Sequence, residues 1–257
     1  MSDNRFSRKD LKQQDDFQRG VTHFAGWLVE RRRTIGLALL AVVAVGSVLA
    51  GVQAYRVRQE QNAAALFAEG MRVYQSAVID MAGLDAAVAS ALGEGDSFAS
   101  DEEKFTAAVA AFQPVVDQYG SQPSGRAAAF YLGISLIELD RGEEAIASLR
   151  AAAESGTPLI RAMSLYRLGT LLSDSDQHGE AIAVFEELAD PAPEGFPIAE
   201  AMFAKARAQE AAGNTDAALT TYQRIADDDP ASIYAIPARS RAEELAARLG
   251  VTLDAES

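Results

Sequence analysis

Few residues in this sequence have the type and spacing that catalysis requires. The chain has no cysteine, which excludes thiol catalysis, disulfides and cysteine-based zinc sites. Its two histidines, His23 and His178, are predicted to lie on opposite sides of a membrane span, so they cannot form a paired site. No phosphate-binding loop, dinucleotide fingerprint, serine-hydrolase elbow or kinase motif is present. We therefore expect a non-catalytic protein that uses no cofactor, metal or small-molecule substrate.

Two acidic strings are the remaining candidates for chemistry. DSDQHG, residues 174–179, imitates the start of a calcium-binding loop, but Phe185 stands where the bidentate glutamate is needed. We interpret this string as a solvated turn. Asp227, Asp228 and Asp229 end a predicted helix, where negative charge is unfavourable to the helix dipole. We interpret them as a solvated edge, with a cation or a basic partner as the alternative.

Small and large side chains recur in phase along the second half of the chain. Ala145, Ala181 and Ala218 are 36 and 37 residues apart, and a large side chain follows each of them four positions later. The predicted repeat-core residues are Leu132, Gly133, Ala145, Leu149, Leu168, Gly169, Ala181, Phe185, Ala206, Ala218 and Tyr222. Facing small residues let two helices approach closely, and the large residue fills the gap toward the next pair. This spacing predicts a helical hairpin that repeats along the chain.

At these residues the chain resembles the tetratricopeptide repeat family. The matching segments are LGISLIELDRGEEAIASLRAAAESGT, LGTLLSDSDQHGEAIAVFEELADPAP and KARAQEAAGNTDAALTTYQRIADDDP, all within residues 126–230. The first segment lacks the family's terminal proline, and the last has Lys205 and Ala206 where the family has Leu-Gly. The resemblance implies an all-α fold, built as a solenoid of stacked hairpins.

The resemblance also implies a binding surface, because in such arrays the first helix of each hairpin lines a concave face. The residues predicted to point into it are Phe130, Ile134, Ile137, Met163, Tyr166, Thr170, Phe203 and Arg207. Phe130, Tyr166 and Phe203 occupy equivalent places, which predicts a ladder of rings. Such a face suits apolar or extended polypeptide segments. The alternative is that the array's own loop or the long N-terminal helix covers these rings.

A divergent copy is predicted to precede the three repeats. Ala108 lies 37 residues before the first of the three alanines, and Phe112 follows it by four. The partner helix is predicted around Gly70. Residues 81–101, rich in glycine, serine and aspartate, are then an insertion within this hairpin.

The charge is unevenly spread along the chain. Residues 1–55 carry eight Lys/Arg against five Asp/Glu, whereas residues 56–257 carry fifteen against thirty-two. A domain this acidic repels phosphate backbones, so nucleic-acid binding is not expected. We interpret the acidity as a source of solubility.

A membrane anchor is predicted at residues 35–54, IGLALLAVVAVGSVLAGVQA, which contain no charge. A helix of this length covers roughly 30 Å, the thickness of the hydrocarbon core of a bilayer. The basic residues before it place the N-terminus in the cytoplasm and the acidic domain across the membrane. The residues predicted at the membrane interface are Trp27, Arg31, Arg32, Arg33 and Tyr55.

The competing interpretation of the apolar run is a cleaved signal peptide, with small residues near Ala50 or Ala54 at the cleavage site. Against it stands an N-terminal region of more than thirty residues, long for a signal. Upstream, an apolar stripe over residues 17–28 predicts a helix that rests on the cytoplasmic leaflet or docks on a membrane partner.

We therefore expect five segments. They are 1–33 (cytoplasmic tail with an amphipathic helix), 34–55 (transmembrane signal-anchor), 56–125 (long helix and divergent repeat), 126–230 (three repeats) and 231–257 (capping helix and tail). The capping helix is predicted over residues 240–249, because the end of an array needs a polar outer face.

The order of these segments resembles the bacterial ancillary SecYEG translocon subunit family. The resemblance implies an inner-membrane protein with a periplasmic repeat domain that assists protein export. Its implied partners are the Sec translocon, a periplasmic chaperone or nascent secreted chains. The alternative function is a periplasmic tetratricopeptide scaffold for envelope assembly or cell division, of the type linked to the Tol-Pal system. Such scaffolds are released by signal cleavage.

Overall fold

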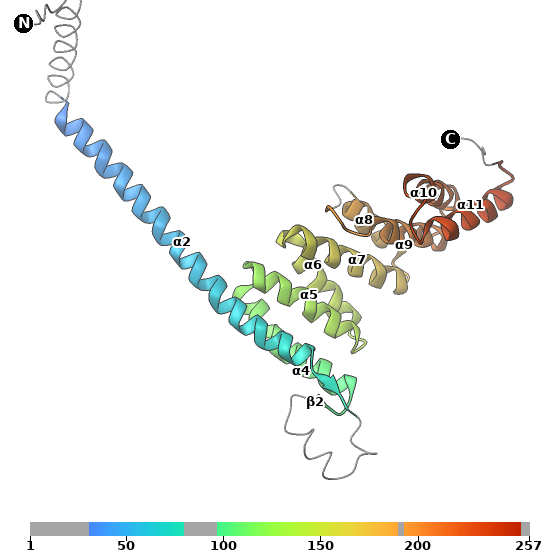
Figure 1. Cartoon of the computed structure of the whole chain (residues 1–257), viewed down its shortest axis with the longest axis horizontal. Helices are drawn as coiled ribbons and strands as arrows, with labels where there is room; N and C mark the ends of the chain where they lie inside the picture. The colour runs from blue at the N-terminus through green and yellow to red at the C-terminus, as the bar shows by residue number, and fades with distance from the viewer. Residues whose placement is uncertain (1–30, 80–96, 190–192, 253–257) are drawn as a thin grey trace, which may run out of the picture. The chain divides into compact units, whose positions relative to one another are not determined.

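The computed structural model describes residues 31–79, 97–189 and 193–252, and nine helices make up most of them (Figure 1). The elements in chain order are α2 (Arg32–Tyr74), β1 (Ala77–Val78), β2 (Ser97–Phe98), α4 (Asp101–Tyr119), α5 (Pro123–Ile137), α6 (Gly142–Ser155), α7 (Pro158–Asp174), α8 (His178–Ala189), α9 (Ile198–Ala211), α10 (Thr215–Asp228) and α11 (Ala235–Leu249). Trp27 and the helix predicted at 17–28 lie outside the described residues, as does most of the predicted insertion. The predicted all-α fold with hairpin packing is confirmed.

The chain divides into two compact units, with the boundary between Arg58 and Gln59. In the first unit, the apolar side chains of α2 are exposed: Leu40, Val45 and Val48 are 68%, 59% and 65% accessible. An 18-residue window within Leu40–Tyr74 has a mean hydropathy of 1.6, and none of it is buried. A helix in the core of a soluble protein would be mostly covered, and this window is not. The helix α2 has the length and composition to cross a membrane.

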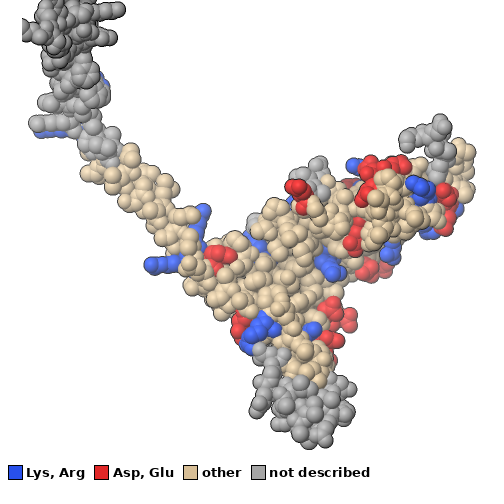
Figure 2. Space-filling view, in the orientation of Figure 1, with Lys and Arg blue, Asp and Glu red and all other residues tan. Residues whose placement is uncertain are grey.

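Of the five residues predicted at the membrane interface, the four that the structure describes lie near the two ends of this apolar part of α2. Arg31 and Arg33 are exposed, Arg32 is the first residue of the helix, and Tyr55 is 64% accessible. Between these ends, Figure 2 shows a stretch of α2 without charged atoms on the face in view.

In the second unit, each helix from α4 to α11 packs against the next one along the chain, as antiparallel hairpins do. The helices that open the hairpins also contact one another, α5 with α7 and α7 with α9. The start of α7 shows why the chain breaks where it does. Thr157 caps this helix by accepting a hydrogen bond from the backbone N–H of Ile160, and Pro158 occupies the first turn, where it needs no N–H partner.

The small residues of the repeat allow close contact between paired helices. A Cβ atom at Gly133 would lie 2.7 Å from Cγ of Leu149, and one at Gly169 would lie 2.7 Å from Cε1 of Phe185. Ala145, Leu149, Ala181, Ala206 and Ala218 are fully buried, Phe185 and Tyr222 are 1% exposed, and Leu132 and Leu168 are 3% exposed. All of these residues therefore belong to the packed interior of the array.

The last part of α2 pairs with α4 in the same way. A Cβ atom at Gly70 would lie 2.5 Å from Cε1 of Phe112, and the rings of Phe67 and Phe112 are 5.9 Å apart. Between these helices, β1 and β2 form a short parallel pair with Ala77 opposite Ser97. The two helices thus pack as a hairpin of the same kind as the later ones.

The final helix, α11, begins at Ala235, five residues before the predicted start at 240. Pro237 lies in the first turn of this helix, where proline is tolerated because that N–H has no helical partner. The helix ends at Leu249 and is followed by Gly250, whose φ of 69° is the left-handed conformation common after a helix C-terminus.

Candidate functional site

The residues predicted to line the concave face lie on α5, α7 and α9, but they are not equally accessible. Phe130 on α5 is only 4% exposed, and its ring packs edge-on against Tyr131 at 5.2 Å. Ile134 and Ile137 are partly buried against the same interior. This copy of the repeat therefore offers little surface to a partner, because its side chains already pack on one another. Its partner-binding role stays a prediction.

Part of α2 covers the neighbouring ring on α5. Tyr131 lies 5.1 Å from Tyr74 and 5.9 Å from Phe67, both on the last turns of α2. The carboxylate of Glu60 fixes the same two helices together, since it accepts hydrogen bonds from the backbone N–H and the hydroxyl of Ser124 at the start of α5. The first part of the array is thus closed by its own N-terminal helix.

Tyr166 on α7 links two repeats. Its hydroxyl donates a hydrogen bond of 2.7 Å to the carboxylate of Glu200 on α9, and its ring lies 6.4 Å from both Phe185 and Phe196. Partial burial, and then the hydrogen bond to Glu200, raise the pKa of Tyr166 to about 12, so the phenol stays protonated and able to donate at neutral pH. Met163 and Thr170 lie on the same helix, one turn before and one turn after Tyr166, and both are partly buried.

Phe203 on α9 packs against two further rings, Tyr222 at 5.2 Å and Tyr234 at 5.5 Å. No ring contact joins Phe130, Tyr166 and Phe203 to one another in the part of the chain that the structure describes. Each of the three rings is held instead by neighbours in its own region of the array.

Two hollows meet at Arg207, an exposed residue of α9. One, of about 190 Å³, lies between α7, α8 and α9, and it includes Thr170 and Phe185. The other, of about 510 Å³, lies between α9, α10 and α11, and it includes Phe203. We call these two hollows together the Arg207 groove. The structure thus brings together three of the predicted concave residues, Thr170, Phe203 and Arg207.

The sequence pattern predicts α11 only as a cap and does not predict that it forms one side of the Arg207 groove. The residues on this side are Pro237, Ser240, Arg241 and Glu244. Their spacing of i, i+3, i+4 and i+7 is that of one helix face, and this was the available signal. Arg207 itself takes part in no ion pair among the described residues, so its guanidinium is available at the groove.

A network of charged side chains stiffens one wall of the groove. The carboxylate of Glu210 accepts hydrogen bonds from Arg241 at 2.9 Å and from the hydroxyl of Tyr222 at 2.8 Å, which joins α9, α10 and α11. Burial opposes ionisation of Glu210, but the hydrogen bonds from Arg241 and Tyr222 outweigh it and lower the pKa of this carboxyl. Arg241 also pairs with Glu244.

We expect Glu210→Gln to lower the free energy of unfolding by about 1–2 kcal/mol at pH 7, because it removes a charged acceptor from two donors. The folded-state pKa lies below the ordinary glutamate value of about 4.3, so this contribution is complete above that pH. It is lost as the pH falls through the lowered pKa. Urea unfolding at pH 7 and at low pH checks this. The matched control is Glu244→Gln, whose carboxylate binds the same arginine but is 58% exposed, and it should change stability by less than about 0.5 kcal/mol. A difference between parent and Glu210→Gln that does not shrink in acid would contradict the assignment.

The acidic string at residues 174–179 lies at the turn between α7 and α8. In the turn 174–179, Asp176 is almost fully exposed and has a φ of 59°, and His178 begins α8. The His178 Nε2 lies 3.6 Å from a carboxylate oxygen of Asp176. Within residues 31–79, 97–189 and 193–252, no three His, Asp or Glu side chains are placed to share a metal ion.

The comparison with protein families agrees with this geometry. The family model of the tetratricopeptide repeat matches residues 84–159 and 162–233, more than half of the chain. No curated protein matches the sequence at a significant level. Two similar solved structures are crystal structures of nearly identical TPR-like repeats from a Podospora anserina protein named after the kinesin light chain. Both are 16% identical to this chain and cover 57% of it, and the chain matches 79% and 80% of their lengths with TM-scores of 0.47 and 0.45.

Proposed function

The chain belongs to the tetratricopeptide repeat family, and from this premise we propose that it is a membrane-anchored module that binds other proteins through the Arg207 groove. The observation that carries the proposal is the groove itself. It combines an apolar ring, Phe203, with the exposed cation of Arg207, on helices that are tied together by the Glu210 network. An extended polypeptide can place apolar side chains against the ring and a carbonyl or carboxylate on the guanidinium.

The anchor is the apolar part of α2. The support is the run of exposed valines and leucines. Leaving an apolar surface of this length in contact with water is unfavourable, and a bilayer would cover it. In this proposal the basic N-terminal tail is cytoplasmic, and the acidic repeats lie on the other side of the membrane.

We further propose that the module works at the bacterial inner membrane, where it assists protein export at the Sec translocon with a periplasmic chaperone. The support is the order of the segments, a short basic tail, an apolar span and an acidic repeat domain. A soluble periplasmic scaffold of the Tol-Pal-linked type would share the repeats but would lose the span by cleavage. N-terminal sequencing of the mature protein separates the two, because only the anchored protein keeps residues 35–54.

The experiment that tests the groove is crosslinking in intact membranes. A photoreactive amino acid replaces Ser240, an exposed residue that lines the groove, in one sample and Glu143, an exposed residue of α6, in the matched control. Arg207 is kept in both. We expect protein adducts at position 240 that are several-fold more abundant than at position 143. Mass spectrometry then identifies them. Equal labelling at both positions would rule out the groove, whereas strong labelling at 240 without translocon or chaperone adducts would keep the binding module and reject its role in export.

A charge reversal at Arg207 gives the second readout. We expect Arg207→Glu to reduce partner binding several-fold, because the acidic chain would then present only negative charge at this point of the groove. The thermal melt should stay at the parent value, since the side chain is exposed and joins no ion pair among the described residues. Undiminished binding by this folded variant would contradict the proposal.

A further inference from the structure

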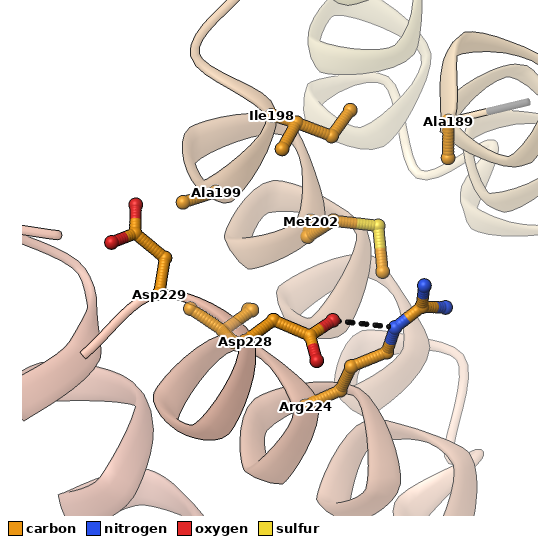
Figure 3. A pocket seen from close by; sticks show the side chains of 8 residues that line it. Ala189, Ile198, Ala199, Met202, Arg224, Asp228 and Asp229 are labelled. Carbon is orange, nitrogen blue, oxygen red and sulfur yellow. Dashed lines mark hydrogen bonds and ion pairs between the residues drawn. The ribbon is translucent and has the colours of Figure 1, made fainter. Parts of the chain in front are cut away.

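A separate hollow, of about 350 Å³, shares no lining residue with the two hollows of the Arg207 groove. It lies where the end of α10 meets the start of α9, with the end of α8 across from them (Figure 3). Its apolar lining residues are Ala189, Ile198, Ala199, Met202 and Ile225. Ile225 is 4% exposed, whereas Ile198 and Met202 are only partly buried. We call this hollow the Met202 pocket.

The mouth of the Met202 pocket is acidic. Asp228 and Asp229 line it and are exposed, and Arg224 pairs with Asp228 at 3.0 Å, which leaves the carboxylate of Asp229 as excess negative charge (Figure 3). These residues stand at the C-terminal end of α10, which has no basic residue in its last turn. The negative end of the helix dipole therefore adds to the charge of the carboxylates and favours a cation at this edge.

We infer that the Met202 pocket receives an apolar side chain from a protein partner, flanked in that partner by lysine or arginine. The volume lies at the low end of the range for ligand pockets, which suits one or two side chains rather than a whole helix. The apolar walls provide burial, and the acidic mouth selects the charge beside the anchor. The same carboxylates repel a segment that carries aspartate or glutamate beside its apolar side chain. This contact goes beyond the proposed function, because it adds a second docking point on a different set of residues.

Methyl resonances of methionine can test this inference, because the chain has only five methionines and one of them, Met202, lines the pocket. Met163 is one of the residues predicted for the concave face. The full chain is labelled at the methionine methyl groups and held in lipid nanodiscs, and Met202→Leu assigns the pocket resonance. The probes are three acetylated, amidated peptides, Gly-Lys-Leu-Lys-Gly, Gly-Glu-Leu-Glu-Gly and Gly-Lys-Ser-Lys-Gly.

We expect the Lys-Leu-Lys peptide to shift the Met202 resonance saturably and to leave Met163 unchanged. The Lys-Ser-Lys peptide should bind about tenfold more weakly, since it lacks the buried leucine. The Glu-Leu-Glu peptide should bind more weakly still, because the acidic mouth repels it. Asp229→Asn, an exposed substitution that the fold should tolerate, is expected to weaken the Lys-Leu-Lys peptide several-fold.

Four results would overturn the inference. The first is a Met202 resonance that no peptide shifts, and the second is an equal shift with the lysine and glutamate peptides. The third is a shift that depends on protein concentration without peptide, which would mean that a second copy of the chain fills the pocket. The fourth is a shift at Met163 alone, which would place the contact elsewhere on the array.

Discussion

Replacing Phe185 by alanine is expected to lower the free energy of unfolding by about 3–5 kcal/mol, the range for deleting a buried phenylalanine. The ring is 1% exposed and its edge rests on Gly169, where a Cβ atom would be 2.7 Å from it. It also lies 6.4 Å from the ring of Tyr166. Because this ring fills the space between two helices, the cavity left by alanine closes only if α7 and α8 move closer together and lose other contacts.

The matched control is Phe185→Leu. In the preceding repeat, Leu149 occupies the equivalent position against Gly133 and is fully buried, so leucine is compatible with this kind of contact. We expect a loss of about 1–2 kcal/mol for leucine. Urea unfolding followed by far-ultraviolet circular dichroism, with both variants in the same detergent, measures the two losses. Equal losses would show that the ring itself is not what fills the space between the helices.

The same contact explains why the fold could be predicted from the sequence. Close approach of two helices requires a small residue on one of them and a large residue on the other that fills the space beside it. Gly133 with Leu149 and Gly169 with Phe185 meet this requirement in phase, and Gly70 with Phe112 meets it in the divergent copy. Because this contact recurs in each hairpin, the small and large residues recur at the same spacing in the sequence. The predicted helices and their pairing follow from it.

The candidate site could be predicted only in part, because its geometry depends on contacts between repeats. Phe130 is buried in one cluster with Ala162 and Leu165 of the following hairpin, whereas Arg207 is exposed, although both lie on first helices. The hydrogen bonds from Tyr166 to Glu200 and from Arg241 to Glu210 join residues more than thirty positions apart. Nothing in the local pattern marks these partners. The Met202 pocket has the same origin, since three helices must meet before it exists.

The largest expected effect outside the repeats concerns the anchor. We expect Val45→Arg combined with Val48→Arg to abolish retention of the protein in the membrane. Both valines lie in the exposed apolar part of α2, 59% and 65% accessible. Each arginine costs roughly 2.5–3.5 kcal/mol at the centre of a membrane helix, so the pair opposes insertion by about 5–7 kcal/mol. Carbonate extraction of isolated membranes, followed by detection of the repeat domain, measures retention.

The control for this experiment keeps the same positions apolar. Val45→Leu with Val48→Leu should leave the protein in the carbonate-resistant fraction, because leucine is as favourable as valine in lipid. The parent protein decides between anchor and signal. If the parent itself is extracted by carbonate, and its N-terminus is found beyond Ala54, then the apolar part of α2 acts only as a signal and the repeats work as a soluble protein. If the parent resists extraction and protease cannot reach the repeats from the cytoplasmic side, the span holds the Arg207 groove at the far surface of the membrane. A polypeptide emerging there would meet the groove at the high local concentration that tethering provides.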